Sequence, residues 1–267
     1  MASTEMLMKA ADAKIRTLIK QVDPADLACH NTGYAQVGDL FENLVAPERA
    51  RYVFALGMLE GQSPGRAVDL GCLFPYMPML LTALGWQVTA VDRYSLYGPS
   101  MHGTLIEAAA SEGFELLDLD MRTELGQVGE ADLVLLMAVV EHLNGSPLEL
   151  VRNIGNLLTP TGGRLLFEVP NIATLWHRLQ LLRGVSPLPD YRTYLRSGYP
   201  FAGHNREMTV GEVRMLLAEA HMAIDDIRCF DYSPSAPGVP SAVLRLVQRV
   251  LPSCRESIMA VAHHEAP

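Results

Sequence analysis

Apolar residues along the middle of the chain gather in short runs that alternate with longer helix-forming stretches. The short runs, several of them β-branched and typical of buried strands, lie at 66–70, 87–91, 114–119, 131–140 and 164–169. The helix-forming stretches between them lie at 78–84, 105–112 and 147–158. Strands that alternate with helices need crossover connections. The pattern therefore predicts an α/β fold, with a mostly parallel sheet covered by helices on both faces.

One uncharged stretch, 70–91, is about as long as a bilayer-spanning helix. Two prolines and two glycines interrupt it, and Asp69 and Asp92 bracket it. Proline inside a helix removes a hydrogen bond and clashes with the preceding turn. A strand end, a loop, a short helix and a second strand explain this stretch better than a membrane span, and we expect no membrane partner.

Both ends of the chain extend this alternating unit. Helical patterns at 6–22 and 47–59 predict an N-terminal helical cap or lid over 1–60, followed by the main domain over 61–267. After the fifth strand, a helix is expected at 171–183, then a loop rich in Pro, Gly and Tyr at 184–203, which together suggest a substrate-cap insertion over about 171–208. Further helices are expected at 209–221 and 243–251, and the last strands at 224–230 and 257–262. Thr209 and Glu212 have the spacing of a capping box.

Composition narrows the class of protein. With 49% apolar and 19% charged residues, the chain is unlike a disordered one. Its 21 basic and 30 acidic residues give a net charge of −9, which disfavours a protein that binds nucleic-acid phosphates. The four cysteines are scattered without zinc-ligand spacing, so we expect no metal and a reducing, cytoplasmic location. The oligomeric state stays open, with a homodimer as one alternative.

The sharpest local signal is Gly71 directly after the first strand, with Asp92 at the end of the second. A glycine there lets the backbone approach a ligand closely, and the acidic residue can accept both hydroxyls of a ribose. Dinucleotide oxidoreductases and S-adenosylmethionine methyltransferases share this layout. The first class requires G-x-G-x-x-G for its pyrophosphate, and only Gly71 stands here, so the second class is favoured.

Five segments in register resemble the successive motifs of class I S-adenosylmethionine-dependent methyltransferases, over roughly residues 66–171. They are AVDLGC at 67–72, VTAVD at 88–92, ADLVLL at 131–136 with EHL at 141–143, and LTPTGG at 158–163 before LLFEVPN at 165–171. HNREMT at 204–209 resembles an element of small-molecule members, and SIMAVA at 257–262 resembles the closing strand. The resemblance implies a Rossmann-like, doubly wound sheet of seven strands and S-adenosylmethionine as cofactor.

The resemblance also implies roles for the residues at the strand ends. The methionine part of the cofactor would lie beside Asp69, Gly71 and Cys72, with Tyr34 as a further contact to its carboxylate. The ribose would be held by Asp92, and the adenine would lie next to Arg93.

The third and fourth strands would complete the cofactor site. Asp120 and Met121 would contact the adenine, with the pair 118–119 as an alternative, and Met137 and Ala138 would line the sulfonium side.

One loop departs from the family pattern. Where most members have further glycines, this chain has Leu73, Phe74, Pro75 and Tyr76. The loop can still present backbone N–H groups to a carboxylate, except at Pro75, which has none. We interpret it as a subgroup trait. The alternative is a methyltransferase fold without catalysis that binds a nucleoside ligand or a protein partner.

Methyl transfer is an in-line displacement that mainly requires alignment of the acceptor. A hydroxyl acceptor benefits from a general base, and His142 or His204 could serve. The alternative for each is structural, with His142 orienting the next helix and His204 fixing its loop. Glu141, Arg206 and Tyr199 are expected to contact the substrate. We predict O-methylation of a small-molecule or sugar-bearing acceptor.

Overall fold

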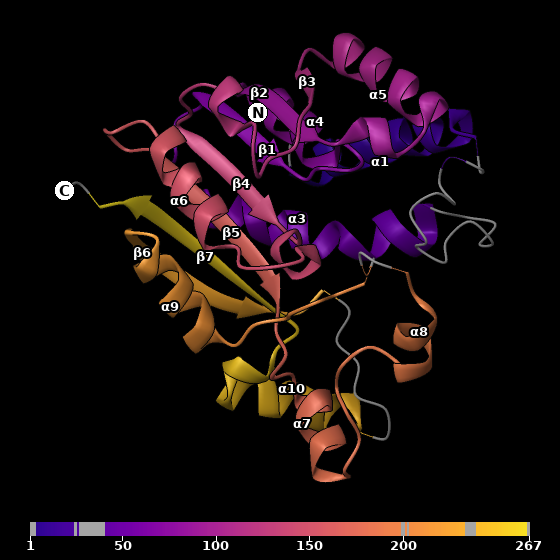
Figure 1. Ribbon diagram of the computed structural model, residues 1–267, viewed down its shortest axis with the longest axis vertical. Helices are drawn as coiled ribbons and strands as arrows, with labels where there is room; N and C mark the ends of the chain where they lie inside the picture. The colour runs from indigo at the N-terminus through magenta and orange to yellow at the C-terminus, as the bar shows by residue number, and fades with distance from the viewer. Residues whose placement is uncertain are drawn as a thin grey trace.

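The computed structural model describes residues 4–23, 26, 41–198, 201, 203–232 and 239–265. Its centre is a seven-stranded sheet (Figure 1) made of β1 (Arg66–Leu70), β2 (Gln87–Asp92), β3 (Glu115–Asp118), β4 (Leu133–Met137), β5 (Arg164–Pro170), β6 (Met222–Phe230) and β7 (Ser257–His264). The strand order is β3-β2-β1-β4-β5-β7-β6. The first five strands are parallel, and β7 runs antiparallel to β5 and β6. The predicted Rossmann-like, mostly parallel sheet is confirmed.

Helices pack on both faces of this sheet. The helices on the two faces are α1 (Thr4–Gln21), α3 (Ala46–Met58), α4 (Tyr76–Ala83), α5 (Pro99–Glu112), α6 (Leu148–Leu157) and α9 (Val210–Glu219). Three further helices, α7 (Leu175–Leu182), α8 (Tyr191–Arg196) and α10 (Ser241–Val250), extend beyond the sheet (Figure 1). Short helical turns occur at η2 (Phe41–Val45), η3 (Tyr94–Leu96), η4 (Leu125–Gln127), η5 (Val140–His142) and η6 (Pro252–Cys254). The uncharged stretch 70–91 becomes the end of β1, a loop, α4 and β2, as expected. No helix among the described residues is long and apolar enough to cross a membrane.

Two apolar cores form because successive side chains of a strand point to opposite faces. Leu133 and Leu135 of β4 belong to the core with α1, α3, α4 and α5, whereas Val134 and Leu136 belong to the core with α6 and α9. All five residues of β4 are buried, as its continuous apolar run predicts.

The N-terminal helices share the first of these cores. Met8, Ala11 and Ile15 of α1 are buried against the helices that cover β1 and β2. The hydroxyl of Tyr76 in α4 donates to the carboxylate of Asp12, with an O–O distance of 2.6 Å. The segment expected as a cap is therefore packed onto the sheet layer by apolar and polar contacts.

The segment after β5 differs most from the expectation. Within the stretch predicted as a loop at 184–203, residues 191–196 form helix α8, so that prediction was wrong there. Its first turn is stabilised by Asp190, whose side chain accepts hydrogen bonds from the N–H groups of Arg192 and Thr193. No residue of α7 or α8 is buried. The leucines of α7 thus do not face a core.

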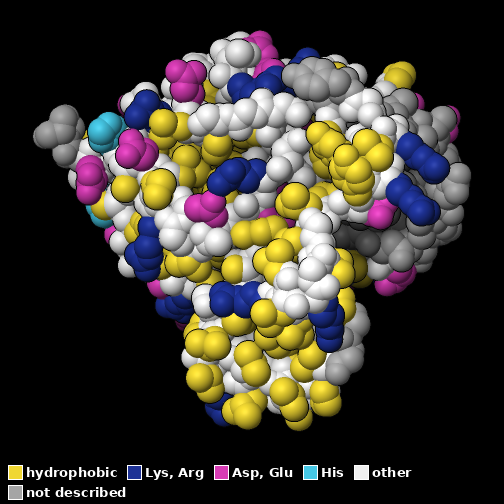
Figure 2. All heavy atoms as spheres, turned by 60° about the horizontal axis from the view of Figure 1, so that its bottom comes forward, with side chains coloured by type: hydrophobic (Ala, Val, Ile, Leu, Met, Phe, Trp, Pro, Cys, Tyr) yellow, Lys and Arg dark blue, Asp and Glu magenta, His cyan; other side chains and the backbone are white. Residues whose placement is uncertain are grey.

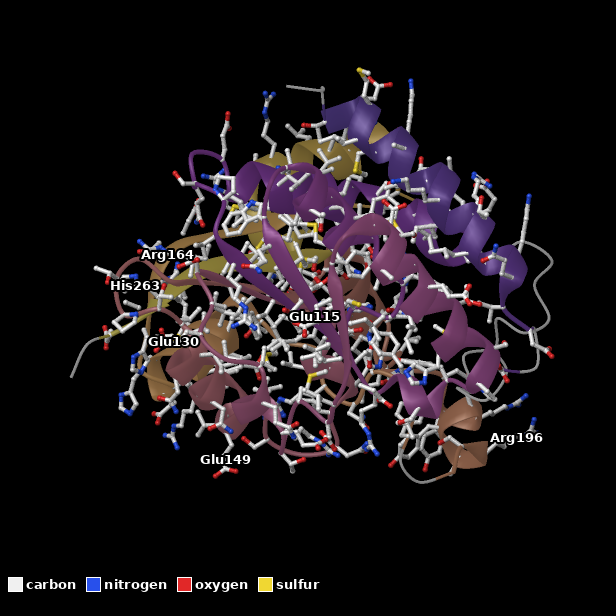
Figure 3. The ribbon with its side chains drawn as sticks, turned by 90° about the horizontal axis from the view of Figure 1, so that it is seen from above. Glu115, Glu130, Glu149, Arg164, Arg196 and His263 are labelled. Carbon is white, nitrogen blue, oxygen red and sulfur yellow. The ribbon has the colours of Figure 1, made fainter. Side chains whose placement is uncertain are left out.

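At the amino end of β5, two basic side chains share one carboxylate. Arg164 Nε lies 2.9 Å from an oxygen of Asp225, and His263 Nδ1 lies 2.8 Å from the other. Arg164, at the start of β5, and His263, near the end of β7, lie near each other in Figure 3. These contacts fasten the antiparallel strands β6 and β7 to the parallel part of the sheet.

The predicted capping box at the start of α9 is present. The Thr209 side chain accepts from the N–H of Glu212, and the Glu212 carboxylate accepts from the N–H of Thr209. Replacing Thr209 with alanine, T209A, should lower the free energy of unfolding by about 1 kcal/mol. Urea denaturation measures this, and an unchanged midpoint would show that the cap contributes nothing.

Candidate active site

Gly71 lies where β1 ends and the first loop begins. Its φ is +74°, and its N–H donates to the carbonyl of Val91 at 2.7 Å. A Cβ on this residue would lie 2.5 Å from Cγ2 of Val139, and Met121 Cε is the next nearest atom at 3.5 Å. Both the backbone conformation and the close approach of β4 therefore require glycine here.

The loop after Gly71 takes a glycine-like path although it lacks the family's further glycines. Leu73 has a φ of +46°, in the left-handed region that glycine favours. Its N–H donates to an Asp92 carboxylate oxygen at 3.0 Å. The same carboxylate accepts from the N–H of Arg93 at 2.7 Å and from the hydroxyl of Tyr97 at 3.2 Å. Asp92 thus ties the end of β2 to the loop that follows β1.

The floor of this site is acidic and mostly enclosed. Asp69 is buried, and burial together with the nearby Asp92 raises the pKa of Asp69 to about 7. The Cys72 thiol lies 2.8 Å from the Tyr94 hydroxyl, and burial raises the pKa of Cys72 well above its usual value. A thiol whose pKa is raised in this way is a poor nucleophile. The carboxylates instead favour a ligand that carries positive charge.

The predicted adenine contacts lie at the adjacent edge. Asp120 pairs with Arg93 at 3.3 Å and with Arg122 at 3.1 Å, and the hydrogen bond from Arg122 lowers the pKa of Asp120. Asp118, at the end of β3, accepts from the N–H and the hydroxyl of Ser95. Both aspartates therefore stay open as adenine contacts.

The end of β4 supplies the next predicted contacts. Ala138 has a φ of +53°, and its N–H donates to the carbonyl of Glu168 at 3.1 Å. Met137 precedes it and pairs in register with Glu168. Met137 and Ala138 thus lie between the β1 end of the site and the turn that carries His142. Tyr34 and Tyr199 lie outside the described residues.

The two candidate bases, far apart in sequence, come together. The rings of His142 and His204 lie 4.9 Å apart, edge to face. Their loops are tied by the N–H of Asn205, which donates to the Glu141 carbonyl at 2.6 Å, and by the Asn205 amide, which donates to the His142 carbonyl at 3.1 Å. The structure thus joins the two motifs that the sequence presented separately.

His204 is oriented by a carboxylate. Its Nδ1 lies 2.8 Å from Glu207 Oε1, so in the neutral ring Nδ1–H donates and Nε2 is left as the acceptor. Burial disfavours the charged ring, but the hydrogen bond to Glu207 and the carboxylates of Glu141 and Glu207 outweigh it. The pKa of His204 is raised as a result.

Glu141 is completely buried, and neither of its carboxylate oxygens has a hydrogen-bond partner in the described part of the chain. Burial, and next the charge of Glu168, raise the pKa of Glu141 to about 8. Glu141, His142 and His204 each offer one ligand atom within 4.8 Å of the others. This arrangement could hold a cation, which the sequence did not predict.

Arg206 turns away from this cluster. Its guanidinium lies 2.6 Å from Glu212 Oε1, at the first turn of α9, and its side chain is 72% exposed. The predicted contact between Arg206 and a substrate stays a prediction.

A second buried group of charges lies beside the histidines, and sequence reasoning missed it. Arg51 of α3 pairs with Glu48 and lies 3.3 Å from Glu168 Oε2, while its guanidinium covers the ring of Tyr232. The two carboxylates outweigh the effect of burial and raise the pKa of Arg51, whereas burial raises the pKa of Glu48. The hydroxyl of Ser257 contacts the other oxygen of Glu168.

Only one member of this group carried a sequence signal. Glu168 is a charged residue that directly follows three apolar ones in the strand at 164–169, and such a residue needs a partner when it is buried. Nothing in the sequence marks Arg51 as that partner, because the two residues are more than a hundred positions apart.

Residues 43–223 match the methyltransferase domain family, which is more than half of the chain. The chain belongs to this family. Its site has the family layout, with a glycine after β1 and an acidic residue at the end of β2. The class I S-adenosylmethionine-dependent type that the motifs indicated is therefore confirmed for this methyltransferase. No curated protein matches it.

Solved structures agree with this assignment. The magnesium protoporphyrin IX methyltransferase of Synechocystis PCC 6803, solved with bound SAH, is 15% identical with a TM-score of 0.56, over 86% of this chain and 89% of that one. A putative S-adenosylmethionine-dependent methyltransferase of Listeria monocytogenes is 14% identical with a TM-score of 0.55, over 82% and 99% of the two chains. The N-methyltransferase NodS of Bradyrhizobium japonicum WM9 is 14% identical with a TM-score of 0.50, over 84% and 99%. At these identities the likeness shows the fold.

Replacing Gly71 with alanine should destabilise the methyltransferase by about 2 kcal/mol or more, because the φ is positive and Val139 is too close. Gly57 in α3 is the matched control, since a Cβ there meets nothing within 4 Å. G57A should raise the free energy of unfolding by up to about 1 kcal/mol. Urea unfolding of both variants tests the difference, and equal effects would contradict it.

The raised pKa of Asp69 predicts a pH dependence of stability. Between about pH 4 and about pH 7 the folded protein keeps the Asp69 proton that the unfolded chain has lost, so stability falls over this range and is level above it. The variant D69N cannot titrate at this position, so it lacks this pH dependence. It should match the parent at about pH 4 and be more stable by about 1 to 4 kcal/mol at about pH 8. Urea unfolding at both pH values checks this, and parallel pH profiles would show that Asp69 is not the cause.

Proposed function

We propose that this methyltransferase transfers a methyl group from S-adenosylmethionine to an oxygen atom of a small-molecule or sugar-bearing acceptor. The observation that carries the proposal is the His142–His204 pair, in which Glu207 orients His204. The pair lies just beyond β4, and Val139, just after that strand, lies against Gly71. Residues 139–142 connect the two halves of the site, because Val139 touches the position of the glycine and His142 follows three residues later.

The cofactor half of the site suits a cationic nucleoside. S-adenosylmethionine, when bound, supplies a methyl group on a sulfonium and also carries an ammonium group. Asp69 and Asp92 offer compensating negative charge, and Gly71 leaves the backbone open to close approach. In this proposal Asp92 holds the ribose, and Met137 and Ala138 line the sulfonium side.

The acceptor half supplies a proton acceptor. A hydroxyl is a weak nucleophile at neutral pH, and a base that removes its proton typically contributes 10²- to 10⁴-fold to the rate. His204 fits this role, because Glu207 fixes its Nδ1 and leaves Nε2 to receive the proton. Glu141 and His142 form the adjacent wall.

Two variants test the role of His204. H204A should lower kcat by about 100-fold or more while cofactor affinity changes little. E207Q removes a contact that raises the pKa of His204, so the acidic limb of the pH–rate profile should move to lower pH. H263A is the matched control, since His263 pairs with Asp225 at the opposite end of β5.

A normal rate in H204A, or an unmoved acidic limb in E207Q, would reject the base. If the cluster works through a bound cation instead, a chelator would abolish activity, whereas under this proposal it leaves the rate unchanged. Methyl-labelled cofactor, incubated with fractionated small molecules of the producing cell, tests the activity itself. Cofactor binding without transfer to any fraction would favour the non-catalytic alternative.

A further inference from the structure

Beyond the carboxyl end of β5, α7 and α10 project from the sheet at the bottom of Figure 1, and α8 lies to their right. We call residues 172–198 and 239–255, which contain α7, α8 and α10, the projecting lobe. Eleven of the sixteen large hydrophobic residues that are exposed in the described part of the chain lie in it. In Figure 2, hydrophobic side chains gather on the part of the molecule that projects at the bottom of the view.

The exposed residues come from all three helices. Leu182 of α7 is 84% exposed and Leu195 of α8 is 63% exposed. Tyr191 and Tyr194 of α8 are also exposed, and their rings stack on each other. An apolar surface of this kind on a projecting lobe indicates a site of interaction.

Helix α10 exposes its most apolar face, whereas a normal surface helix buries it. Val243, Leu246 and Val250 follow one face and are all exposed. The face that packs on the protein is carried by Leu244 and Gln248, and Gln248 donates to an oxygen of Asp231 at 2.8 Å. The strongest apolar stripe of the helix therefore points away from the protein.

The projecting lobe is also basic, although the whole chain has a charge of −9. It contains seven arginines and one aspartate, and no glutamate or lysine. Arg245 and Arg249 of α10 are exposed and pair with no carboxylate in the described part of the chain. Arg196 projects from α8 at the margin of the molecule (Figure 3).

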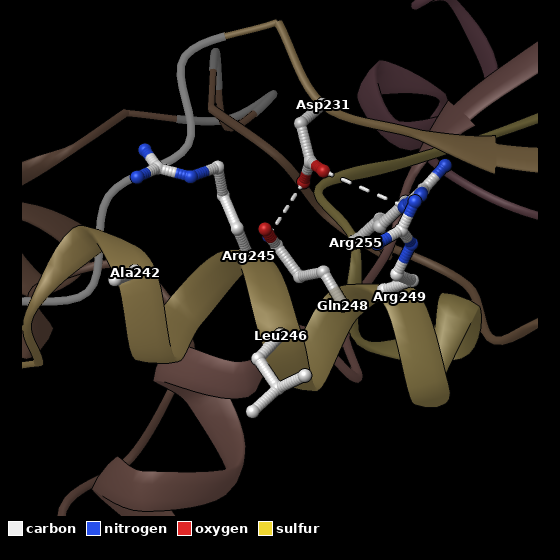
Figure 4. Close-up of a pocket in the computed structure, with 7 residues that line it drawn as sticks. All are labelled: Asp231, Ala242, Arg245, Leu246, Gln248, Arg249 and Arg255. Carbon is white, nitrogen blue, oxygen red and sulfur yellow. Dashed lines mark hydrogen bonds and ion pairs between the residues drawn. The ribbon is translucent and has the colours of Figure 1, made fainter.

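These charges border an open hollow of about 510 Å³ beside α10 (Figure 4). Arg245, Arg249 and Arg255 line it together with Leu246. Arg255 lies 3.6 Å from Asp231, which leaves an excess of positive charge around the hollow. Arginine is well suited to bind phosphate groups.

We propose that the projecting lobe binds the surface of a membrane that contains anionic phospholipids. Leucines and valines would enter the acyl boundary, the tyrosines would lie at headgroup level, and the arginines of the hollow would bind lipid phosphates. This mode of binding attaches the protein to one leaflet and requires no spanning helix. The finding that no described helix can span a membrane is therefore compatible with it. The sequence-based expectation of no membrane partner considered only a span.

The charge distribution favours a membrane over other occupants. A second copy bound about a two-fold axis would place one basic lobe against another. A nucleic acid would use the arginines but would leave the exposed leucines and valines in water. A phospholipid surface satisfies both groups at once.

The lobe leaves the sheet at the same end as the His142–His204 pair, since β5 runs directly into it. Attachment there would hold the candidate active site close to the lipid surface. The proposal does not depend on methyl transfer, because the surface would bind lipid whether or not the site is catalytic.

Vesicle flotation of the full chain tests the proposal, with phosphatidylcholine alone and with about one third phosphatidylglycerol. We expect binding to the anionic vesicles and much weaker binding to the neutral ones. The double variant L246E/V250E should abolish flotation. R245Q/R249Q should weaken binding by about fivefold for each arginine removed. The matched control is R214Q/M215E on α9, where Arg214 and Met215 are exposed outside the lobe, and it should bind like the parent.

No flotation of the parent, or equal loss in the α9 control, would overturn the proposal. Displacement by inorganic phosphate together with normal binding of L246E/V250E would show a phosphate pocket instead. A dimer in sedimentation analysis that L246E/V250E converts to a monomer would show a second copy as the occupant. Cofactor titration of the same variants, expected to match the parent, separates this outcome from a failure of the proposed activity.

Discussion

The Asp92 carboxylate is the contact on which the cofactor half of the site depends. It accepts hydrogen bonds from the N–H groups of Leu73 and Arg93 and from the Tyr97 hydroxyl, so it joins three segments at the carboxyl edge of the sheet. Leu73 is held in a conformation that costs a non-glycine residue about 1 to 2 kcal/mol, and the hydrogen bond to Asp92 offsets part of that cost. This side-chain contact thus holds Leu73 in a backbone conformation that glycine normally adopts.

Buried charge dominates the other half of the site. Burying one unpaired carboxylate is costly, and here Glu48 and Glu168 are compensated by Arg51. The carboxylate of Glu141 has no hydrogen-bond partner among the described residues, and burial raises its pKa despite the nearby charges of His204 and Arg51. Sites of chemistry often keep such perturbed groups, because a packed apolar core would be more stable but inert. In the proposed function, this cluster holds the base beside the acceptor.

The sequence predicts the sheet well because the spacing of apolar residues and the positions of Gly and Pro are local signals. Gly71 and Asp92 could be placed at strand ends, and the family motifs indicated His142 and His204 as candidate general bases. The pairing of Arg51 with Glu168 could not be predicted, because it joins α3 to β5 across the fold and depends on side-chain packing. The predicted loop at 184–203 contains α8, since the cap made by Asp190 outweighs the surrounding Pro and Gly. The leucines of α7, at positions 175, 179 and 182, are spaced along one face of a helix. This spacing predicts the helix but does not predict whether its apolar face is buried in a core.

The measurement that tests the central claim most directly is calorimetric titration of the purified chain with S-adenosylmethionine and S-adenosylhomocysteine. The account predicts that both bind, and that D92A weakens binding by about 10- to 100-fold through lost charge-assisted hydrogen bonds. D226A, in the edge strand β6 on the far side of the sheet from β2, is the matched control, and thermal unfolding confirms that each variant is folded. Absence of binding at about millimolar ligand, or equal affinity in D92A and the parent, would contradict the account.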